Sequence, residues 1–159
     1  MSLTFLDSTT VGWLLLGCFG GAIVSAIVPW VNAELLLLAA MPVAMKHQAS
    51  VPLVIVVAFG QMTGKSVLYW LARTAKVPRA ERLANAIERW RARFERHPRS
   101  AIAIMGVSAV SGFPPFYVIS VVAGALRISF VAFLMVGSLG RLTHFGLVAA
   151  VPHLVGRWL

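Results

Sequence analysis

The chain has 159 residues, of which 59% are hydrophobic and only 12% are charged. Soluble domains carry about 45–50% apolar and about 25% charged residues, so this composition points away from a soluble domain and toward lipid. The net charge of +9 does not indicate nucleic-acid binding, because nine of the 14 lysines and arginines lie between Arg73 and Arg99. The single cysteine, Cys18, excludes an intrachain disulfide and a cysteine-built metal site, and no cofactor or metal is expected.

Residues 11–28 are predicted to form the first transmembrane helix. This apolar stretch is about one bilayer thickness long for a helix that rises about 1.5 Å per residue. Its glycines, alanines and serines allow close packing against other helices in lipid. The residues before it carry Asp7 and no basic cluster, so we expect an attached membrane helix and not a cleaved signal peptide.

Residues 29–45 are predicted to enter the membrane without crossing it. The apolar run between Pro29 and Pro42 is shorter than a span, and runs of about 10–14 apolar residues are typical of re-entrant or interfacial segments. Asn32 and Glu34 come soon after the first proline.

A full-length span is predicted for residues 51–72. Its glycines Gly60 and Gly64 are four residues apart and allow a close helix contact. Gln61 and Lys65 are also four residues apart, so these two polar side chains share one helical face and are candidate site residues.

Residues 73–99 interrupt the apolar composition. Leu83, Ile87, Trp90 and Phe94 have the spacing of a single helical face, which predicts an amphipathic helix on an anionic lipid surface. A solvated linker helix that sets the topology and a soluble coiled coil are the alternatives. Because loops rich in lysine and arginine stay on the cytoplasmic side, this basic segment is predicted to be cytoplasmic.

Residues 100–126 are predicted to form a second re-entrant segment. Pro114 and Pro115 lie in its middle, and two consecutive prolines cannot sit within an unbroken helix. In lipid, such irregular backbone persists only where protein or a wet cavity covers it.

The two halves of the chain share one pattern. Each has a proline-interrupted segment followed by a full span with glycines and a cation, which is Lys65 in one half and Arg141 in the last predicted span, residues 128–151. With residues 73–99 in the cytoplasm, the halves enter the bilayer from opposite faces. We therefore predict an all-α membrane protein, a polytopic helical bundle with two opposed re-entrant hairpins as an inverted repeat, and a mid-membrane binding site. Resemblance through composition alone is the alternative.

Few charges fall within the apolar depth, namely Glu34, Lys65, Arg141 and the titratable His144. Each charge costs about 2.5–3.5 kcal/mol on insertion scales unless it is paired or hydrated, so we interpret them as functional. The two cations suit a phosphate. Glu34 suits proton transfer in a low-dielectric environment, or it is the structural counter-ion of one cation. His144 is interpreted as a packed, hydrogen-bonded histidine, with a proton relay as the alternative. The absence of a nucleophile–base pair or metal-ligand cluster argues against an enzyme.

Several short motifs follow one another along the chain. They are Pro29-x-x-Asn32-x-Glu34, Gly60-x-x-x-Gly64, Ala123-Gly124-x-x-Arg127 and Gly137-x-x-Gly140-Arg141. In order and spacing, over residues 24–150, they resemble the DedA family, also called the VTT or SNARE-associated Golgi-protein domain, and within it the YqaA-like bacterial branch. The resemblance implies a polytopic inner-membrane protein with two opposed re-entrant hairpins. It also implies a role in lipid translocation or membrane homeostasis.

The resemblance assigns positions in the family pattern to several residues. Glu34 matches the acidic position of the first hairpin, and Gly124 and Arg127 match the positions after the second. The hairpin backbone would be formed by Pro29, Asn32, Pro114, Pro115 and Gly124.

Three positions depart from the family pattern. Gly112 and Val118 stand where the family commonly has arginines, and Tyr117 stands where the branch tends to have an acidic residue. The phosphate-binding or proton-coupled mechanism of the family therefore cannot be assumed in full for this chain.

The expected function is translocation of phospholipid or undecaprenyl phosphate, or membrane homeostasis, in the bacterial inner membrane. The site candidates are Glu34, Lys65, Arg141, Gln61 and Arg127. The expected partners are anionic lipid head groups, and a homo-oligomer is considered because one short chain encloses little cavity. A proton-coupled exporter of small cations and a non-transporting scaffold are the alternatives.

Overall fold

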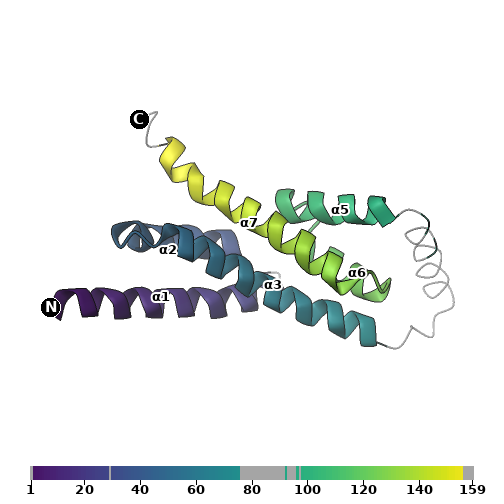
Figure 1. Cartoon of the computed structure of the whole chain (residues 1–159), viewed down its shortest axis with the longest axis horizontal. Helices are drawn as coiled ribbons and strands as arrows, with labels where there is room; N and C mark the ends of the chain where they lie inside the picture. Colours follow the sequence, from purple (N-terminus) through teal and green to yellow (C-terminus); the bar gives the residue numbers. More distant parts are fainter. Residues whose placement is uncertain (1, 29, 76–91, 93–95, 97, 156–159) are drawn as a thin grey trace. The chain divides into compact units, whose positions relative to one another are not determined.

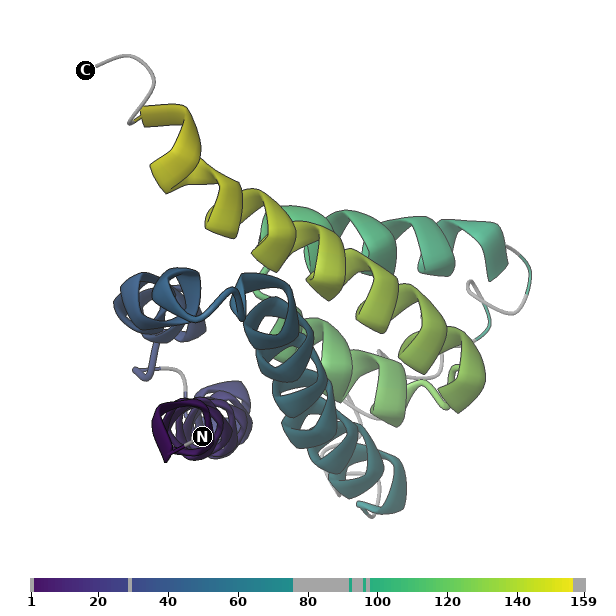
Figure 2. The same ribbon diagram turned by 60° about the vertical axis from the view of Figure 1, so that its left-hand side comes forward.

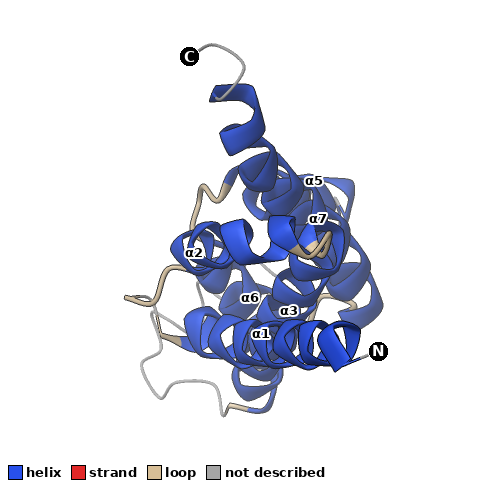
Figure 3. Cartoon of the chain, turned by 90° about the vertical axis from the view of Figure 1, so that its left-hand side faces the viewer, coloured by secondary structure: helices blue, strands red, loops and turns tan. Residues whose placement is uncertain are grey.

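The computed structural model describes residues 2–28, 30–75, 92, 96 and 98–155, and every regular element in these ranges is a helix (Figures 1 and 3). The helices are α1 (Ser2–Ile27), α2 (Ala33–Lys46), α3 (Ser50–Thr74), α5 (Pro98–Ser111), α6 (Phe116–Ala125) and α7 (Phe130–Val155). The all-α prediction is therefore confirmed for the described residues. Pro29 and most of the predicted amphipathic helix 73–99 lie outside them.

Three helices are long and apolar enough to cross a membrane. They are Thr9–Ile27 within α1, Ser50–Thr74, which is α3, and Phe130–Val151 within α7. They overlap the three predicted spans, although α1 begins earlier and α7 ends later than predicted. The helices therefore have the length and composition that the prediction requires, and the crossing itself stays a prediction. The chain has the helices of a membrane protein.

The two predicted re-entrant segments contain shorter helices. α2 and α5 have 14 residues each and α6 has 10. At about 1.5 Å per residue, none of them reaches across a hydrocarbon core of about 30 Å. α2 continues through Pro42, since a single proline removes only one donor from the helix. The re-entrant path itself stays a prediction.

The described residues form two units. The first comprises α1, α2, α3 as far as Gly64 and α7 from Arg141 onward. Within it α1 and α2 lie side by side, as the views in Figures 1 and 2 agree. Its core is apolar, and the largest side chains buried there are Leu37, Met41, Leu53 and Phe145.

Two glycines of α3 bring its backbone against α1. A Cβ atom at Gly60 would lie 2.7 Å from the carbonyl oxygen of Phe19, and one at Gly64 would lie 2.7 Å from that of Ile23. A side chain at either position would therefore push the helices apart. The predicted close helix contact at these glycines is confirmed.

The second unit, Lys65–Gly140, contains the end of α3, α5, α6 and the start of α7. An aromatic cluster forms its core: the rings of Tyr69 and Phe133 stack at 5.0 Å, and those of Phe116 and Phe133 at 6.0 Å between centroids. Rings at such distances contribute beyond the area they bury. Gly124 of α6 lies so close to the backbone of Tyr69 that no side chain would fit there.

The connection between α5 and α6 places both prolines outside the helices. Gly112 has a φ of 76°, a region open to glycine, and Pro115 stands directly before α6 as its N-cap residue. The hydroxyl of Ser108 donates a hydrogen bond to the carbonyl of Pro114 and so satisfies part of this irregular backbone. The predicted interruption of residues 100–126 is confirmed.

The short helices α2 and α6 end with the same backbone geometry. After each helix a residue takes a positive φ, 54° at Gln48 and 55° at Arg127. After each helix, three successive backbone N–H groups donate to carbonyls four, three and five residues earlier. After α2 the pairs are His47 to Val43, Gln48 to Met45 and Ala49 to Ala44. After α6 they are Leu126 to Val122, Arg127 to Gly124 and Ile128 to Ala123. Each unit therefore contains a short helix with the same C-terminal geometry, which is a common one for α-helices. The inverted repeat stays a prediction.

Replacing Gly64 by alanine is expected to lower the free energy of unfolding by about 1–3 kcal/mol, because the new methyl group overpacks the contact with Ile23. Thermal unfolding of the purified protein in detergent, followed by circular dichroism, measures this effect. Gly17→Ala is the matched control, since a Cβ at Gly17 meets nothing within 4 Å. Equal losses in the two variants would contradict the close contact.

Candidate functional site

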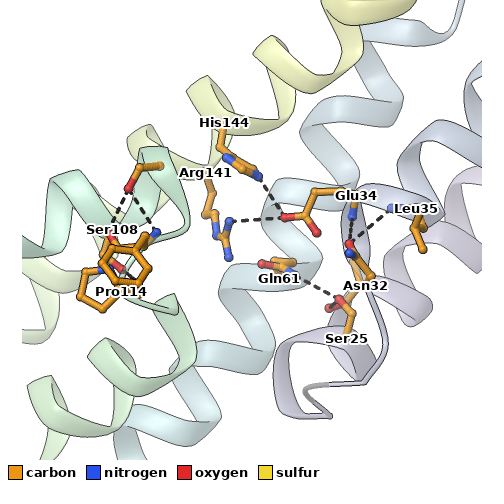
Figure 4. A network of polar contacts seen from close by, with 12 residues as sticks. Ser25, Asn32, Glu34, Leu35, Gln61, Ser108, Pro114, Arg141 and His144 are labelled. Carbon is orange, nitrogen blue, oxygen red and sulfur yellow. Dashed lines mark hydrogen bonds and ion pairs between the residues drawn. The ribbon is translucent and has the colours of Figure 1, made fainter.

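The start of α2 places an acidic side chain inside the first unit. Asn32 is the N-cap residue, and its Oδ1 accepts hydrogen bonds from the backbone nitrogens of Glu34 at 2.8 Å and Leu35 at 3.4 Å (Figure 4). This cap satisfies amides that the helix itself leaves free. Glu34 therefore lies in the first turn of α2, where the helix dipole favours a negative charge.

Glu34 contacts two basic side chains of α7. Nε2 of His144 lies 2.9 Å from Oε1 of Glu34, at hydrogen-bond distance, and Nη1 of Arg141 lies 4.0 Å from the same oxygen (Figure 4). Arg141 and His144 are three residues apart and so project from one face of α7. We call these three residues the charged cluster.

Burial differs among the three residues of the charged cluster. Arg141 is 6% exposed, and its guanidinium carbon lies 5.5 Å from the ring centroid of the buried Phe145. The side chains of His144 and Glu34 are 15% and 35% exposed. A charge as buried as that of Arg141 is stable only with a partner, and Glu34 supplies the opposite charge.

A buried amide lies beside the charged cluster in the same unit. Nε2 of Gln61 donates a hydrogen bond to Oγ of Ser25 at 3.1 Å, and that hydroxyl donates to the carbonyl of Ala22 at 2.8 Å. Gln61 is only 3% exposed. In Figure 4 the oxygen end of its amide lies on the side of Arg141.

An apolar cavity of about 280 Å³ lies in the same unit. Met41 of α2, Val51 and Val54 of α3, and Gly146 and Ala149 of α7 line it. Gly146 is two residues beyond His144 and therefore projects from another face of α7, and none of the three residues of the charged cluster lines the cavity.

The structure brings some predicted site residues together and assigns others to the second unit. Glu34, Arg141 and Gln61 belong to the first unit, and the ion pair between Glu34 and Arg141 bears out the counter-ion interpretation. Lys65, 3% exposed with Nζ 5.8 Å from the ring centroid of Phe116, and Arg127, exposed in the turn after α6, belong to the second unit.

Sequence reasoning missed two partners in this region. His144 is hydrogen-bonded, as predicted, but the sequence did not name Glu34 as its partner; its position one turn from Arg141 was the available signal. Ser25 looked like one of several small residues of a packing helix, and no local pattern indicated its bond to Gln61.

The second unit holds a further polar contact at the end of α3. The hydroxyl of Tyr69 donates to the carbonyl of Ile128, and Arg73 donates to the Tyr69 oxygen. The Arg73 guanidinium carbon also lies 5.4 Å from the Trp70 ring centroid. These contacts join the end of α3 to the turn that carries Arg127.

Among the described residues, no group of three His, Cys, Asp or Glu side chains has the arrangement of a metal site.

Glu34→Gln and Arg141→Met are each expected to lower the free energy of unfolding by about 1–3 kcal/mol, because each variant leaves the other side chain with a weaker partner. The double variant should lose less than the sum, with a coupling of about 0.5–3 kcal/mol. Unfolding in detergent measures all three, and Lys46→Met, at an exposed lysine of α2, is the control. Strictly additive losses would show that the ion pair contributes nothing.

The chain was also compared with known proteins. No protein-family model matches the sequence, and no curated protein or solved structure matches the chain.

Proposed function

We propose that this protein moves lipid head groups across a membrane, with phospholipid or undecaprenyl phosphate as the lipid, or maintains membrane homeostasis through that movement. The observation that carries the proposal is the charged cluster, in which the buried Arg141 and the partly buried His144, both on the membrane-length helix α7, contact the half-exposed Glu34. Charged side chains at such positions are costly and are typical of transport pathways.

The chemistry of the cluster suits a polar head group. Arg141 presents donors to a phosphate, and Arg can hold a phosphate with two parallel hydrogen bonds. Nε2 of His144 becomes a second donor when Glu34 releases it. Glu34 offers a carboxylate that can exchange its partner for a proton or for a cationic group. The first unit also contains an apolar cavity lined by residues of α2, α3 and α7, which offers a hydrocarbon chain an apolar surface in the same unit as the charged cluster.

The finer architecture is part of the same proposal. The short helices α2 and α6 would be the two opposed re-entrant hairpins of an inverted repeat, as the resemblance to the DedA family implies. Their shared C-terminal geometry is compatible with this. Residues 73–99 would be cytoplasmic at the bacterial inner membrane, and anionic lipids and a second copy of the chain are the proposed partners. Lys65 and Arg127 are candidate head-group contacts in the second unit.

Glu34→Ala and Arg141→Ala are each expected to reduce lipid flipping at least tenfold, because each removes one half of the ion pair that would release and receive the head group. The assay reconstitutes the purified protein into proteoliposomes and follows fluorescent lipids by dithionite quenching. Lys46→Ala, which removes an exposed charge from α2, is the matched control and should flip lipid at the wild-type rate. Unchanged rates in both cluster variants would overturn the site assignment.

A proton-coupled exporter of small cations is the second candidate. The contact of 2.9 Å between Glu34 and His144 favours it, because two titratable groups in hydrogen-bond contact can pass a proton. Such an exporter would drive cation efflux from vesicles under a pH gradient and would leave lipid flipping at the rate of empty liposomes.

Single cysteines at positions 46, 89 and 157, introduced into a Cys18→Ala background, test the proposed topology. Position 89 is expected to react with membrane-impermeant maleimide only from the cytoplasmic side, and positions 46 and 157 only from the other side. Cys18 is the only native thiol and is buried, so its removal leaves no competing label. Labelling of position 89 from outside would refute the opposed orientation of the two halves.

A further inference from the structure

The buried amide of Gln61 has a defined orientation. A serine hydroxyl has one proton, and that of Ser25 is donated to the carbonyl of Ala22 at 2.8 Å. The Ser25 oxygen can therefore only accept at 3.1 Å from Gln61, which requires the amide nitrogen of Gln61 there and not its oxygen. Oε1 of Gln61 consequently occupies the other end of the amide, on the side of Arg141 in Figure 4.

The packing of α3 on α1 holds Gln61 in this place. Gly60 directly precedes it, Gly64 follows within one turn, and both lie against the backbone of α1. The backbone at Gln61 cannot move toward α1, and Gln61 is only 3% exposed to solvent. The amide is thus a rigid part of the site wall.

Oε1 of Gln61 has no hydrogen-bond partner among the residues that the structure describes. Buried acceptors nearly always have a donor, because leaving one without a donor is destabilising. This oxygen lies in the unit that holds the charged cluster, so a ligand bound at the cluster can supply the donor.

The charges of the cluster further restrict the chemical class of the ligand. Glu34 already balances Arg141, so the site carries little net positive charge for an anion that brings only acceptors. A ligand that pairs an acidic group with an N–H or O–H donor matches both the basic side chains and the Gln61 oxygen.

We propose that Gln61 determines head-group specificity: its Oε1 accepts a hydrogen bond from an ammonium or hydroxyl group of the ligand, while Arg141 and His144 contact the ligand's phosphate. This inference rests on the proposed lipid-binding function and deepens it. It distinguishes ethanolamine and glycerol head groups, which carry donors, from choline, whose trimethylammonium group has no N–H.

Calorimetric titration of the purified full-length protein in detergent tests the inference. The probes are short-chain phosphatidylethanolamine and phosphatidylcholine with identical acyl chains, which differ only in the methyl groups on nitrogen. The wild type should bind phosphatidylethanolamine about tenfold more tightly, the effect of one buried hydrogen bond. Gln61→Met keeps the size of the side chain, removes the acceptor and should reduce the preference to below about twofold.

The control is Thr63→Val on the exposed face of α3, where the hydroxyl bonds only to its own helix at Phe59, and it should keep the wild-type preference. Ser25→Ala provides a second, smaller change that releases the Gln61 amide and should weaken the preference even if Gln61→Met fails to fold. An unchanged preference in folded Ser25→Ala and Gln61→Met would overturn the inference.

The remaining outcomes separate the inference from the proposed function. Binding of neither lipid by the wild type would overturn lipid binding and the inference with it. Equal binding of both lipids would overturn the role of Gln61 and leave lipid binding intact. Glycerophosphoethanolamine, which has no acyl chains, is the third probe: if it binds as tightly as the lipid, the inference about Gln61 is supported and a lipid ligand is not.

Discussion

Glu34 and Arg141 meet among apolar helices, where neither charge is stable without a partner. Glu34 begins α2 and Arg141 lies on α7, so their contact joins segments far apart in sequence. His144 reinforces it with a hydrogen-bond contact of 2.9 Å to the same carboxylate oxygen. The constraint explains why the N-terminal turn of α2 lies against α7, and why the polar side chains of the first unit collect there.

The close approach of α3 to α1 makes a second polar feature possible. Only glycine at positions 60 and 64 allows the two backbones to come together, and this approach brings Gln61 to Ser25. Packing in lipid depends on such small residues, since lipid tails compete for apolar contacts as well as another helix does. The glycines therefore do more than pack: they determine where a buried amide presents its oxygen.

The first unit combines two surfaces of opposite character. The charged cluster and the Gln61 amide offer donors, acceptors and both signs of charge, whereas the cavity between α2, α3 and α7 is apolar. A lipid combines the same two characters in one molecule, and this match is the reason for proposing lipid movement.

Much of the architecture followed from the sequence, because it depends on local properties. Apolar length predicted the three membrane-length helices, the prolines at 114 and 115 predicted the break between α5 and α6, and the spacing of Gly60 and Gly64 predicted a close contact. The cost of charge in lipid singled out Glu34, Lys65 and Arg141, together with the titratable His144, without saying which of them meet. Only the tertiary structure decided that Glu34 and Arg141 are partners, that His144 joins them, and that Ser25 orients Gln61. Those pairings link helices distant in the chain, and neither spacing nor hydropathy records which faces of two helices meet.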